Sequence, residues 1–316
     1  MATTKSALTF RMRPRPPFRL DLTVWALRRR ERNVVDTWDG STYRRVLVLD
    51  GVPVAISLRQ LGSSEYPSLL VKANAPPHLH PSLAKSLTSM LGLQVDLDRF
   101  YAMSMRDRRL APLVEQFRGV KPPRFPSPFE AFVNAVACQQ LSLTVGIELL
   151  NRLAIQFGPT AGMDVPQHAF PRPEDVVRID PNHFRQLGFS YNKARSILEF
   201  ANLIVSGHFD AGALEQANNS AALEQLRGLR GVGRWTAEYV LLRGLGRIDV
   251  FPGDDVGARN RLATWLRRRE ELSYEVVERI VARWRPYAGL VYFHLLLEGL
   301  AKSGDLTHAD AAQRSA

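Results

Sequence analysis

The chain has 316 residues, with 42 Lys or Arg against 31 Asp or Glu, so its formal charge is +11. An apolar share of 45% supports folded cores, which excludes disorder, collagen and coiled coil, and the length predicts about two domains. The single cysteine, Cys138, excludes an intramolecular disulfide, a four-cysteine zinc site and an iron–sulfur cluster. Neither a secretory signal nor a membrane span is expected, which favours a cytoplasmic protein, and the positive charge favours a polyanionic partner.

Residues 1–16 are basic and rich in proline and are expected to form a tail. Residues 17–104 combine period-two alternation with one helical pattern over residues 81–91, and Asp50-Gly51 is a strong hairpin-turn signal. The strand-like segments are residues 18–22, 43–49 and 69–73. These features predict a small antiparallel α+β domain.

A proline-rich stretch, residues 121–128, marks a change in pattern, after which strand-like alternation largely disappears. The helical patterns that follow cover residues 129–157, 192–206, 220–227, 235–245, 255–268 and 274–302. Residues 105–302 are therefore expected to be all-α, either as one unit or as two helical subdomains with a cleft between them. Residues 303–316 are expected to form a polar tail.

The most informative stretch is residues 226–237, which read Leu-Arg-Gly-Leu-Arg-Gly-Val-Gly-Arg-Trp-Thr-Ala. A helical pattern stops at Gly228, and a second helix begins near Trp235. Gly231 and Gly233 bracket one apolar residue and permit a turn with positive φ and close approach of another backbone. The amides that open the second helix lie at the positive end of its dipole, which suits a phosphate oxygen.

This string resembles the helix-hairpin-helix motif, Leu-x-Gly-Val-Gly-x-x-Thr-Ala, of DNA glycosylases. In that family a Gly/Pro-rich loop and an Asp follow the hairpin. Residues 250–257, Val-Phe-Pro-Gly-Asp-Asp-Val-Gly, supply both, with Asp255 placed 20 residues after Trp235. The resemblance implies that Asp255 is the catalytic acid and that Asp254 is its variable neighbour. Asp is also a favoured N-cap, so Asp255 is expected to open the following helix.

Glycosylases that also cut the DNA strand carry a hairpin lysine that forms a Schiff base. Residue 235 is Trp at that position, and the nearest lysine, Lys193, lies 42 residues upstream without a matching motif. The resemblance therefore implies a monofunctional enzyme in which water attacks the sugar. The missing cysteines argue against the iron–sulfur branch.

Trp235 and Tyr239 are four residues apart and share one helix face, a spacing that core packing also produces. Both match base-pocket aromatics of the 3-methyladenine DNA glycosylase II (AlkA-like) branch, and electron-rich rings favour a positively charged alkylated base. Tyr287 is a candidate third wall of the pocket. Residues 37–45 resemble the N-terminal domain of that branch, an antiparallel sheet with helices of the TBP-like kind.

The family resemblance assigns three further groups. Residues 129–142 resemble the segment in which Gln140 is the wedge that fills the space of the flipped nucleotide. Phosphate-binding positions and backbone carbonyls for a structural Na⁺ or K⁺ follow from the hairpin match. The phosphate-binding residues are Gly231, Gly233, Arg234 and Thr236, and the carbonyl ligands are Arg227, Leu229 and Val232.

The resemblance thus implies a monomeric base-excision-repair hydrolase that releases 3-methyladenine and related alkylated purines from double-stranded DNA after base flipping. Such an enzyme would require no redox or organic cofactor, and it would associate with the nucleoid when bound to DNA. Two alternatives stand beside it. One is a noncatalytic helix-hairpin-helix DNA-binding protein, and the other is an 8-oxoguanine glycosylase, which the absent lysine disfavours.

Overall fold

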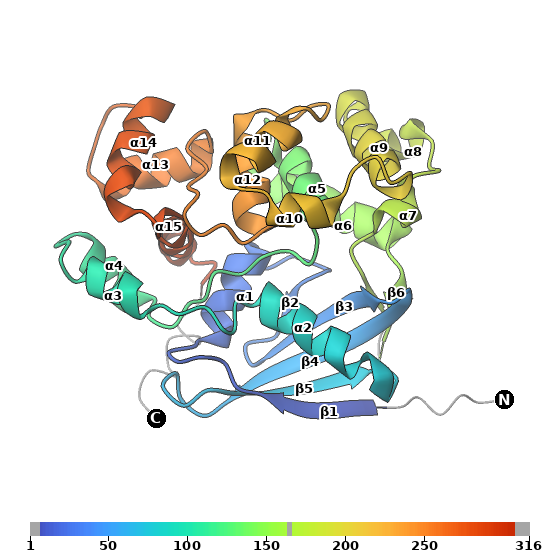
Figure 1. Ribbon diagram of the computed structural model, residues 1–316, viewed down its shortest axis with the longest axis horizontal. Coiled ribbons are helices and arrows are strands. Elements are labelled where there is room, and N and C mark those ends of the chain that lie inside the picture. The colour runs from blue at the N-terminus through green and yellow to red at the C-terminus, as the bar shows by residue number, and fades with distance from the viewer. Residues whose placement is uncertain (1–6, 163–165, 307–316) are drawn as a thin grey trace.

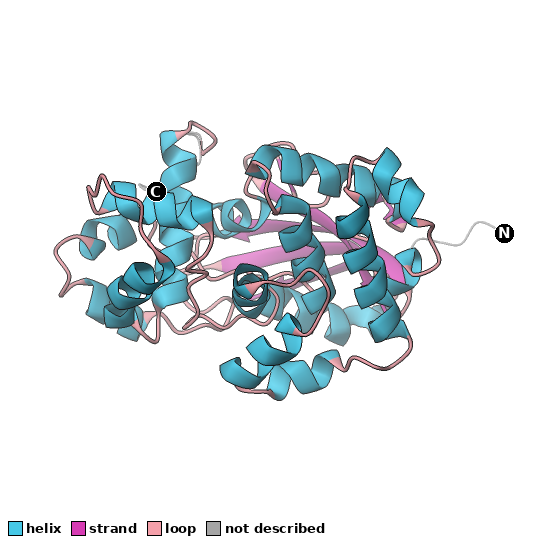
Figure 2. Cartoon of the chain, turned by 90° about the horizontal axis from the view of Figure 1, so that it is seen from above, coloured by secondary structure: helices cyan, strands magenta, loops and turns pink. Residues whose placement is uncertain are grey.

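A computed structural model describes residues 7–162 and 166–306, in which a layer of helices lies over one face of an antiparallel sheet (Figures 1 and 2). Five strands form the sheet in the order β1-β5-β4-β3-β2, and every neighbouring pair is antiparallel. The strands are β1 (Ala7–Met12), β2 (Thr37–Trp38), β3 (Thr42–Leu49), β4 (Val52–Leu61) and β5 (Ser68–Asn74). The fold class is confirmed: an antiparallel α+β unit is followed by a mostly helical one.

The predicted hairpin joins β3 to β4 at Asp50 and Gly51. Both residues have positive φ, +48° and +80°, which is the conformation that a two-residue turn between twisted antiparallel strands requires. The predictions of strands over residues 43–49 and 69–73 are confirmed. The helix predicted over residues 81–91 is α2 (His80–Met90), which packs its apolar face on the sheet.

Two predictions for the N-terminal part are wrong. Residues 7–12, expected to lie in a basic tail, form edge strand β1, paired with β5. Residues 18–22, expected to be a strand, enter helix α1 (Leu20–Arg28), of which all nine residues are buried. A five-residue alternation is too short to distinguish a strand from the start of a helix.

Helix α1 lies between two apolar cores. Leu20, Val24 and Leu27 belong to the core shared with the sheet, whereas Leu22 and Trp25 belong to the core of the C-terminal helices. Its C-terminal end therefore emerges where the two parts of the helical layer meet. This placement brings the residue that follows the helix to the cavity described below.

The helical layer contains two main groups of helices. The helices of the central group are α5 (Pro128–Cys138), α6 (Leu143–Phe157), α7 (Pro173–Val176), α8 (Pro181–Gln186), α9 (Tyr191–Val205), α10 (Ala211–Gln216), α11 (Asn219–Arg227) and α12 (Arg234–Arg243). The helices of the other group are α3 (Asp98–Ser104), α4 (Leu110–Gln116), α13 (Val256–Trp265), α14 (Tyr274–Val281) and α15 (Ala288–Lys302). Two short strands, β6 (Thr160–Ala161) and β7 (Gln167–His168), pair between α6 and α7.

The continuous helix predicted over residues 274–302 is instead broken. Helix α14 ends at Val281, a 3-10 turn covers Ala282–Trp284, and α15 starts at Ala288. Pro286 explains the break, because proline lacks the amide hydrogen and disfavours helical backbone at the residue before it. The break decides which side chains of α15 face the cavity. Of the polar tail predicted over residues 303–316, residues 307–316 lie outside the described residues.

Candidate active site

The hairpin joins α11 to α12 through residues 228–233. Gly231 has a φ of +74°, and an added Cβ would lie 2.6 Å from Ser196 Oγ, so both conformation and space call for glycine. Gly233 is the N-cap of α12 and has open space around it. Val232 between them is buried, whereas both glycines and Arg234 are exposed. The first amides of α12 thus face an open surface at the positive end of a helix dipole.

The side chain of Thr236, one of the expected phosphate-binding residues, does not face this surface. It is 1% exposed, and its hydroxyl oxygen accepts a hydrogen bond from Gln139 Nε2 at 3.0 Å. The same Gln139 amide donates to the carbonyl of Gly231 at 3.0 Å. Thr236 therefore connects the hairpin to the loop between α5 and α6 rather than presenting a hydroxyl to solvent.

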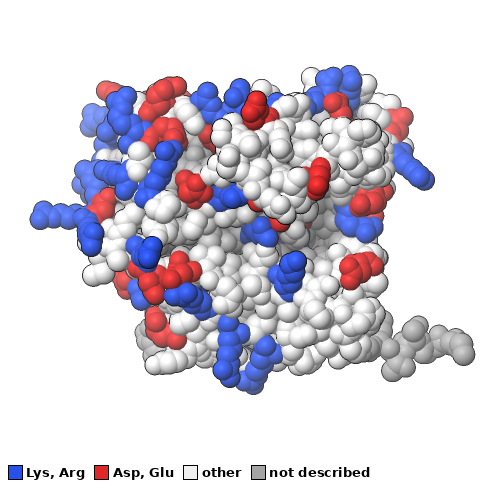
Figure 3. Space-filling model, in the orientation of Figure 1, with Lys and Arg blue, Asp and Glu red and all other residues white. Residues whose placement is uncertain are grey.

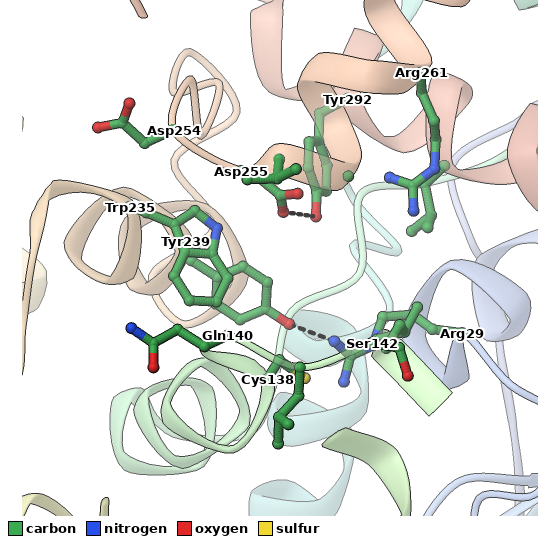
Figure 4. Close-up of a pocket in the computed structure, with 15 residues that line it drawn as sticks. Arg29, Cys138, Gln140, Ser142, Trp235, Tyr239, Asp254, Asp255, Arg261 and Tyr292 are labelled. Carbon is green, nitrogen blue, oxygen red and sulfur yellow. Dashed lines mark hydrogen bonds between the residues drawn. The ribbon is translucent and has the colours of Figure 1, made fainter. Parts of the chain in front are cut away.

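A cavity of about 440 Å³ opens beside the hairpin (Figure 4). Its walls come from segments far apart in the chain: the end of α1, the α5–α6 loop, α12, the loop before α13, and α15. The lining residues include Trp235, Tyr239, Asp255 and Gln140, which the sequence assigned to one site, together with Arg29, Cys138, Arg261 and Tyr292. The volume falls in the range typical of small-molecule sites, roughly 300–1,000 Å³.

Asp255 is both the N-cap of α13 and a wall of the cavity. Its Oδ1 accepts a hydrogen bond from the Ala258 amide at 2.8 Å, and its Oδ2 accepts one from the Tyr292 hydroxyl at 3.4 Å. Burial and the nearby Asp255 carboxylate raise the pKa of Tyr292 well above its ordinary value, so this hydroxyl keeps its proton and donates. A capping carboxylate whose position is set by two donors is suited to stabilise positive charge that develops next to it.

Asp254, the neighbouring acid, is oriented differently. Its carboxylate lies 3.9 Å from the guanidinium of Arg234, and Figure 4 shows it directed away from Asp255 and Tyr292. The backbone turn separates the two side chains, because the amide of Asp255 donates to the carbonyl of Pro252 at 3.0 Å. Two adjacent carboxylates therefore have distinct surroundings: Asp255 faces the aromatic wall and Asp254 faces the hairpin.

The aromatic wall consists of Trp235 and Tyr239, whose ring centroids are 5.9 Å apart at an interplanar angle of 52°. The Trp235 indole N–H is buried without a hydrogen-bond partner among the described residues, and its ring lies over the cavity in Figure 4. Tyr239 is anchored from below, because its hydroxyl accepts a hydrogen bond from Arg29 at 2.8 Å. Burial raises the pKa of Tyr239, which keeps that hydroxyl neutral.

Tyr287, the expected third wall, does not line this cavity. It is the N-cap of α15, and its ring packs 5.9 Å from that of Phe100 in the core of the C-terminal helices. Tyr292, one turn and a half further along α15, takes the place at the cavity. Tyr287 was expected within a continuous helix over residues 274–302, whereas the structure places Tyr292 of α15 at the cavity.

Arg29 is the residue that sequence reasoning missed most completely. It follows α1 in a left-handed conformation with a φ of +60°, is 4% exposed, and donates to Tyr239 and to Asn134 Oδ1 at 2.6 Å. It lies within three consecutive arginines, residues 28–30, a pattern that usually indicates a solvated surface. No local sequence signal distinguishes it from its neighbours.

Gln140 and Leu141 form the rim of the cavity on the α5–α6 loop. Gln140 is exposed and has a φ of +55°, an uncommon conformation for a residue other than glycine, and Leu141 is 42% exposed. Lys193 fastens this loop from behind, with its ammonium donating to the carbonyls of Ala137 at 3.1 Å and Gln139 at 2.7 Å. Lys193 thus stabilises the backbone of the α5–α6 loop. Among the described residues, no lysine lines the cavity.

Basic side chains surround the helical layer on the face shown in Figure 3. They gather most densely on the side where α3, α4, α13 and α14 lie in Figure 1. Within residues 7–162 and 166–306, no group of three or more His, Cys, Asp or Glu side chains could hold a metal ion. In the same part of the chain, no helix is sufficiently long and apolar to cross a membrane.

Comparison with known proteins agrees with this geometry. Residues 133–286 match the model of the HhH-GPD superfamily of base excision DNA repair proteins. The chain is 27% identical over 214 residues to the DNA-3-methyladenine glycosylase of Bacillus subtilis. This match covers 67% of this chain and 71% of the relative. The chain is 28% identical to DNA-3-methyladenine glycosylase 2 of Escherichia coli, over 56% of this chain and 60% of that protein.

A solved structure extends the similarity to the N-terminal sheet. The 3-methyladenine DNA-glycosylase from Archaeoglobus fulgidus superposes with a TM-score of 0.83 at 27% identity, covering 93% of this chain and 99% of that one. The sheet and the helical layer therefore recur together as one architecture.

Proposed function

We propose that the protein is a monofunctional DNA glycosylase of base excision repair, which hydrolyses the N-glycosidic bond of 3-methyladenine and related alkylated purines in double-stranded DNA. One observation carries the proposal: Asp255, held by Ala258 and Tyr292, faces an aromatic-walled cavity that opens beside a helix-hairpin-helix turn. The names of the relatives in Bacillus subtilis and Escherichia coli support the choice of substrate.

Binding would begin at the hairpin. The exposed amides around Gly231 and Gly233, with the Arg234 guanidinium, are suited to hold backbone phosphates without reading sequence. The target base lies inside the duplex, so the nucleotide must be extruded at a cost of a few kcal/mol, which damage reduces. Gln140, exposed at the rim of the cavity, would fill the space left in the base stack.

Chemistry would follow in the cavity. The extruded base would stack on Trp235 above Tyr239, where electron-rich rings favour the positive charge of an N-alkylated purine. As the glycosidic bond breaks, positive charge develops on the sugar. Asp255 would stabilise this charge and orient or deprotonate the attacking water, and the products would be the free base and an abasic site.

The backbone of the hairpin is also suited to a monovalent cation. Among the described residues, the carbonyls of Arg227 and Val232 accept no backbone hydrogen bond, and the carbonyl of Leu229 accepts one from the Val232 amide at 3.2 Å. Carbonyl oxygens are suitable ligands for Na⁺ or K⁺, so these three would hold such an ion and stiffen the turn. We place the enzyme in the cytoplasm as a monomer that associates with the nucleoid when bound to DNA.

Two alternatives are less well supported. A noncatalytic DNA-binding protein needs the hairpin but not an oriented carboxylate facing a cavity. An 8-oxoguanine glycosylase that also cuts the strand needs an amine nucleophile, whereas residue 235 is Trp and the Lys193 ammonium is held by backbone carbonyls.

Release of 3-methyladenine from methylated duplex DNA tests the proposal. We expect Asp255→Asn to reduce the rate by about 10²- to 10⁴-fold, the range typical of general acid–base and electrostatic catalysis, with affinity for duplex containing an abasic site retained. Asp254→Asn is the matched control and should stay within a few-fold of the wild type, because that carboxylate faces Arg234.

Unchanged release by Asp255→Asn would overturn the catalytic assignment. A borohydride-trapped covalent adduct between the wild type and DNA would overturn the monofunctional mechanism, since trapping requires an imine and no lysine within residues 7–162 and 166–306 lines the cavity.

A further inference from the structure

Glu238 is a buried carboxylate that the mechanism above does not use. It lies in α12, one residue before the aromatic Tyr239, and is 4% exposed. Its Oε2 accepts a hydrogen bond from the backbone amide of Gly253 at 3.0 Å, and its Oε1 accepts one from the hydroxyl of Tyr274 at 2.7 Å. The side chain thus connects three elements: α12, the loop that ends at Asp255, and α14.

Tyr274 confines the same loop from a second side. A Cβ added at Gly253 would lie 2.8 Å from Tyr274 Cε2, so the ring packs directly on the backbone of this glycine. The Arg234 guanidinium also contacts this ring and lies 4.1 Å from its centroid. Gly253 is therefore enclosed by a carboxylate that binds its amide and by an aromatic ring that restricts its movement.

We propose that Glu238 is a positioning residue for Asp255, which anchors the catalytic loop through the Gly253 amide and is itself oriented by Tyr274. This inference rests on the proposed function and deepens it. Asp255 lies two residues after the anchored amide, and its own contacts to Pro252, Ala258 and Tyr292 depend on the path of that loop. A displacement of about 1 Å at a reacting group can reduce a rate by about 10²-fold, so an anchor at Gly253 would affect chemistry without touching DNA.

The charges around Glu238 predict how this anchor responds to pH. Burial raises its pKa to about 7, the hydrogen bonds from Tyr274 and Gly253 oppose that shift, and the carboxylates of Glu278 and Asp254 add to it. The positively charged Arg234 lies over the ring of Tyr274, 4.1 Å from its centroid. Because the two hydrogen bonds favour the ionised carboxylate, the anchor is stronger above pH 7 than below it.

Single-turnover release of 3-methyladenine separates positioning from binding. We expect Glu238→Ala to slow release at least about tenfold at pH 8, with affinity for duplex containing an abasic site within about twofold of wild type. The release rate of Glu238→Gln should be within about threefold of the wild-type rate, because its amide can accept a hydrogen bond from Gly253 and donate one to Tyr274. The release rate of Tyr274→Phe, which keeps the ring but removes the hydroxyl, should lie between the rates of Glu238→Ala and Glu238→Gln. The Gln and Phe variants conserve volume, so the test remains if the Ala variant does not fold.

The pH profile distinguishes the anchor from ordinary packing. The wild-type rate should contain a component that rises with pH around 7, and Glu238→Gln should lack it. Glu278→Gln should shift that component to lower pH without changing the rate at its plateau, because it removes a carboxylate that raises the Glu238 pKa. A pH component that persists in Glu238→Gln, or wild-type release by Glu238→Ala, would overturn the inference.

Hydrogen exchange at the Gly253 amide provides a readout that does not depend on the proposed function. Glu238→Ala should speed this exchange by tenfold or more, while amides in β4 stay unchanged. If the wild type releases no alkylated base but the exchange effect is present, the proposed function fails and the anchor stands. If the wild type releases the base but Glu238→Ala does not change exchange at Gly253, the proposed role of Glu238 is wrong and the proposed function stands.

Discussion

Two buried arginines of the N-terminal unit, Arg45 and Arg29, show how differently the same side chain is used in two regions of this molecule. Arg45 on β3 donates to Asp36 at 2.7 Å and to Glu130 on α5 at 2.6 Å, so two carboxylates surround one guanidinium. Arg29 donates to the neutral oxygens of Tyr239 and Asn134, and within the described residues it makes no ion pair. In the Arg45 network, carboxylates compensate the positive charge, and the network joins the sheet to the helical layer. The contacts of Arg29 leave positive charge at the wall of a cavity.

The contrast between the ion-paired Arg45 and the unpaired charge of Arg29 distinguishes buried polar groups that stabilise the fold from those that form a site. A buried ion pair with all partners present fixes one element against another, and Tyr43 strengthens it by donating to Asp36 at 2.6 Å. A buried charge without a counter-ion tends to occur where a ligand or developing charge completes the set. Variants of groups in both surroundings can test whether a buried group serves the fold or the site.

Glu130→Ala should destabilise the fold by about 3–5 kcal/mol, because it removes one partner of a fully buried guanidinium. We expect a lower midpoint of urea unfolding, with the single-turnover release rate of the folded protein unchanged. Glu174→Ala is a matched control, since this carboxylate is exposed and lies 4.0 Å from Arg172, and it should cost less than about 1 kcal/mol. A large loss of release rate without loss of stability would show that the Arg45 network serves the site.

Glu238 should make stability depend on pH. Its folded pKa, about 7, lies above its ordinary value of 4.5, so the protonated form is favoured by folding. This contribution is fully present below about pH 4.5 and is lost as pH rises through 7, and it is worth up to about 3 kcal/mol. Glu238→Gln should lack it, so the unfolding free energy of the wild type should fall relative to the variant across this window. A difference that does not change with pH would contradict the prediction.

Trp235→Ala should reduce release of 3-methyladenine by about tenfold, because base–aromatic stacking contributes about 1–3 kcal/mol. Trp235→Phe keeps a smaller ring and should retain most of the rate. Stability should change little in either variant, since Trp235 lies at the cavity and is only partly buried. Equal rates in the Ala and Phe variants would indicate that the ring fills space rather than stacking on the base.

Arg234→Ala should weaken DNA binding uniformly across sequences and reduce the slope of log affinity against log salt concentration by about one. The measurement is a salt titration of binding to undamaged duplex. Arg230→Ala is a useful comparison, because Arg230 is also exposed but lies closer to its carboxylate partner, at 3.2 Å from Glu199 against 3.9 Å between Arg234 and Asp254. An unchanged slope in Arg234→Ala would show that the phosphate lies elsewhere.

Local signals account for what was predicted correctly. The hairpin turn at Asp50 and Gly51 and the glycine at 231 have positive φ, which few residue types adopt readily, so their positions can be recognised without knowing the fold. Residues 18–22 and 274–302 were mispredicted for the opposite reason. The alternation over residues 18–22 is too short to exclude a helix, and the pattern over residues 274–302 continues across Pro286 although the backbone does not.

The sequence by itself determined the hairpin, the acid 20 residues after Trp235 and the absence of a lysine at position 235, because each depends on residues close together in the chain. Tertiary structure decided the rest. It placed Arg29 and Tyr292 at the cavity, left Tyr287 outside the cavity wall, paired the Thr236 hydroxyl with Gln139, and set Glu238 against the loop that carries Asp255. The physical reason is that the cavity is enclosed by segments from both ends of the chain, and the facing side of each is set by packing between them.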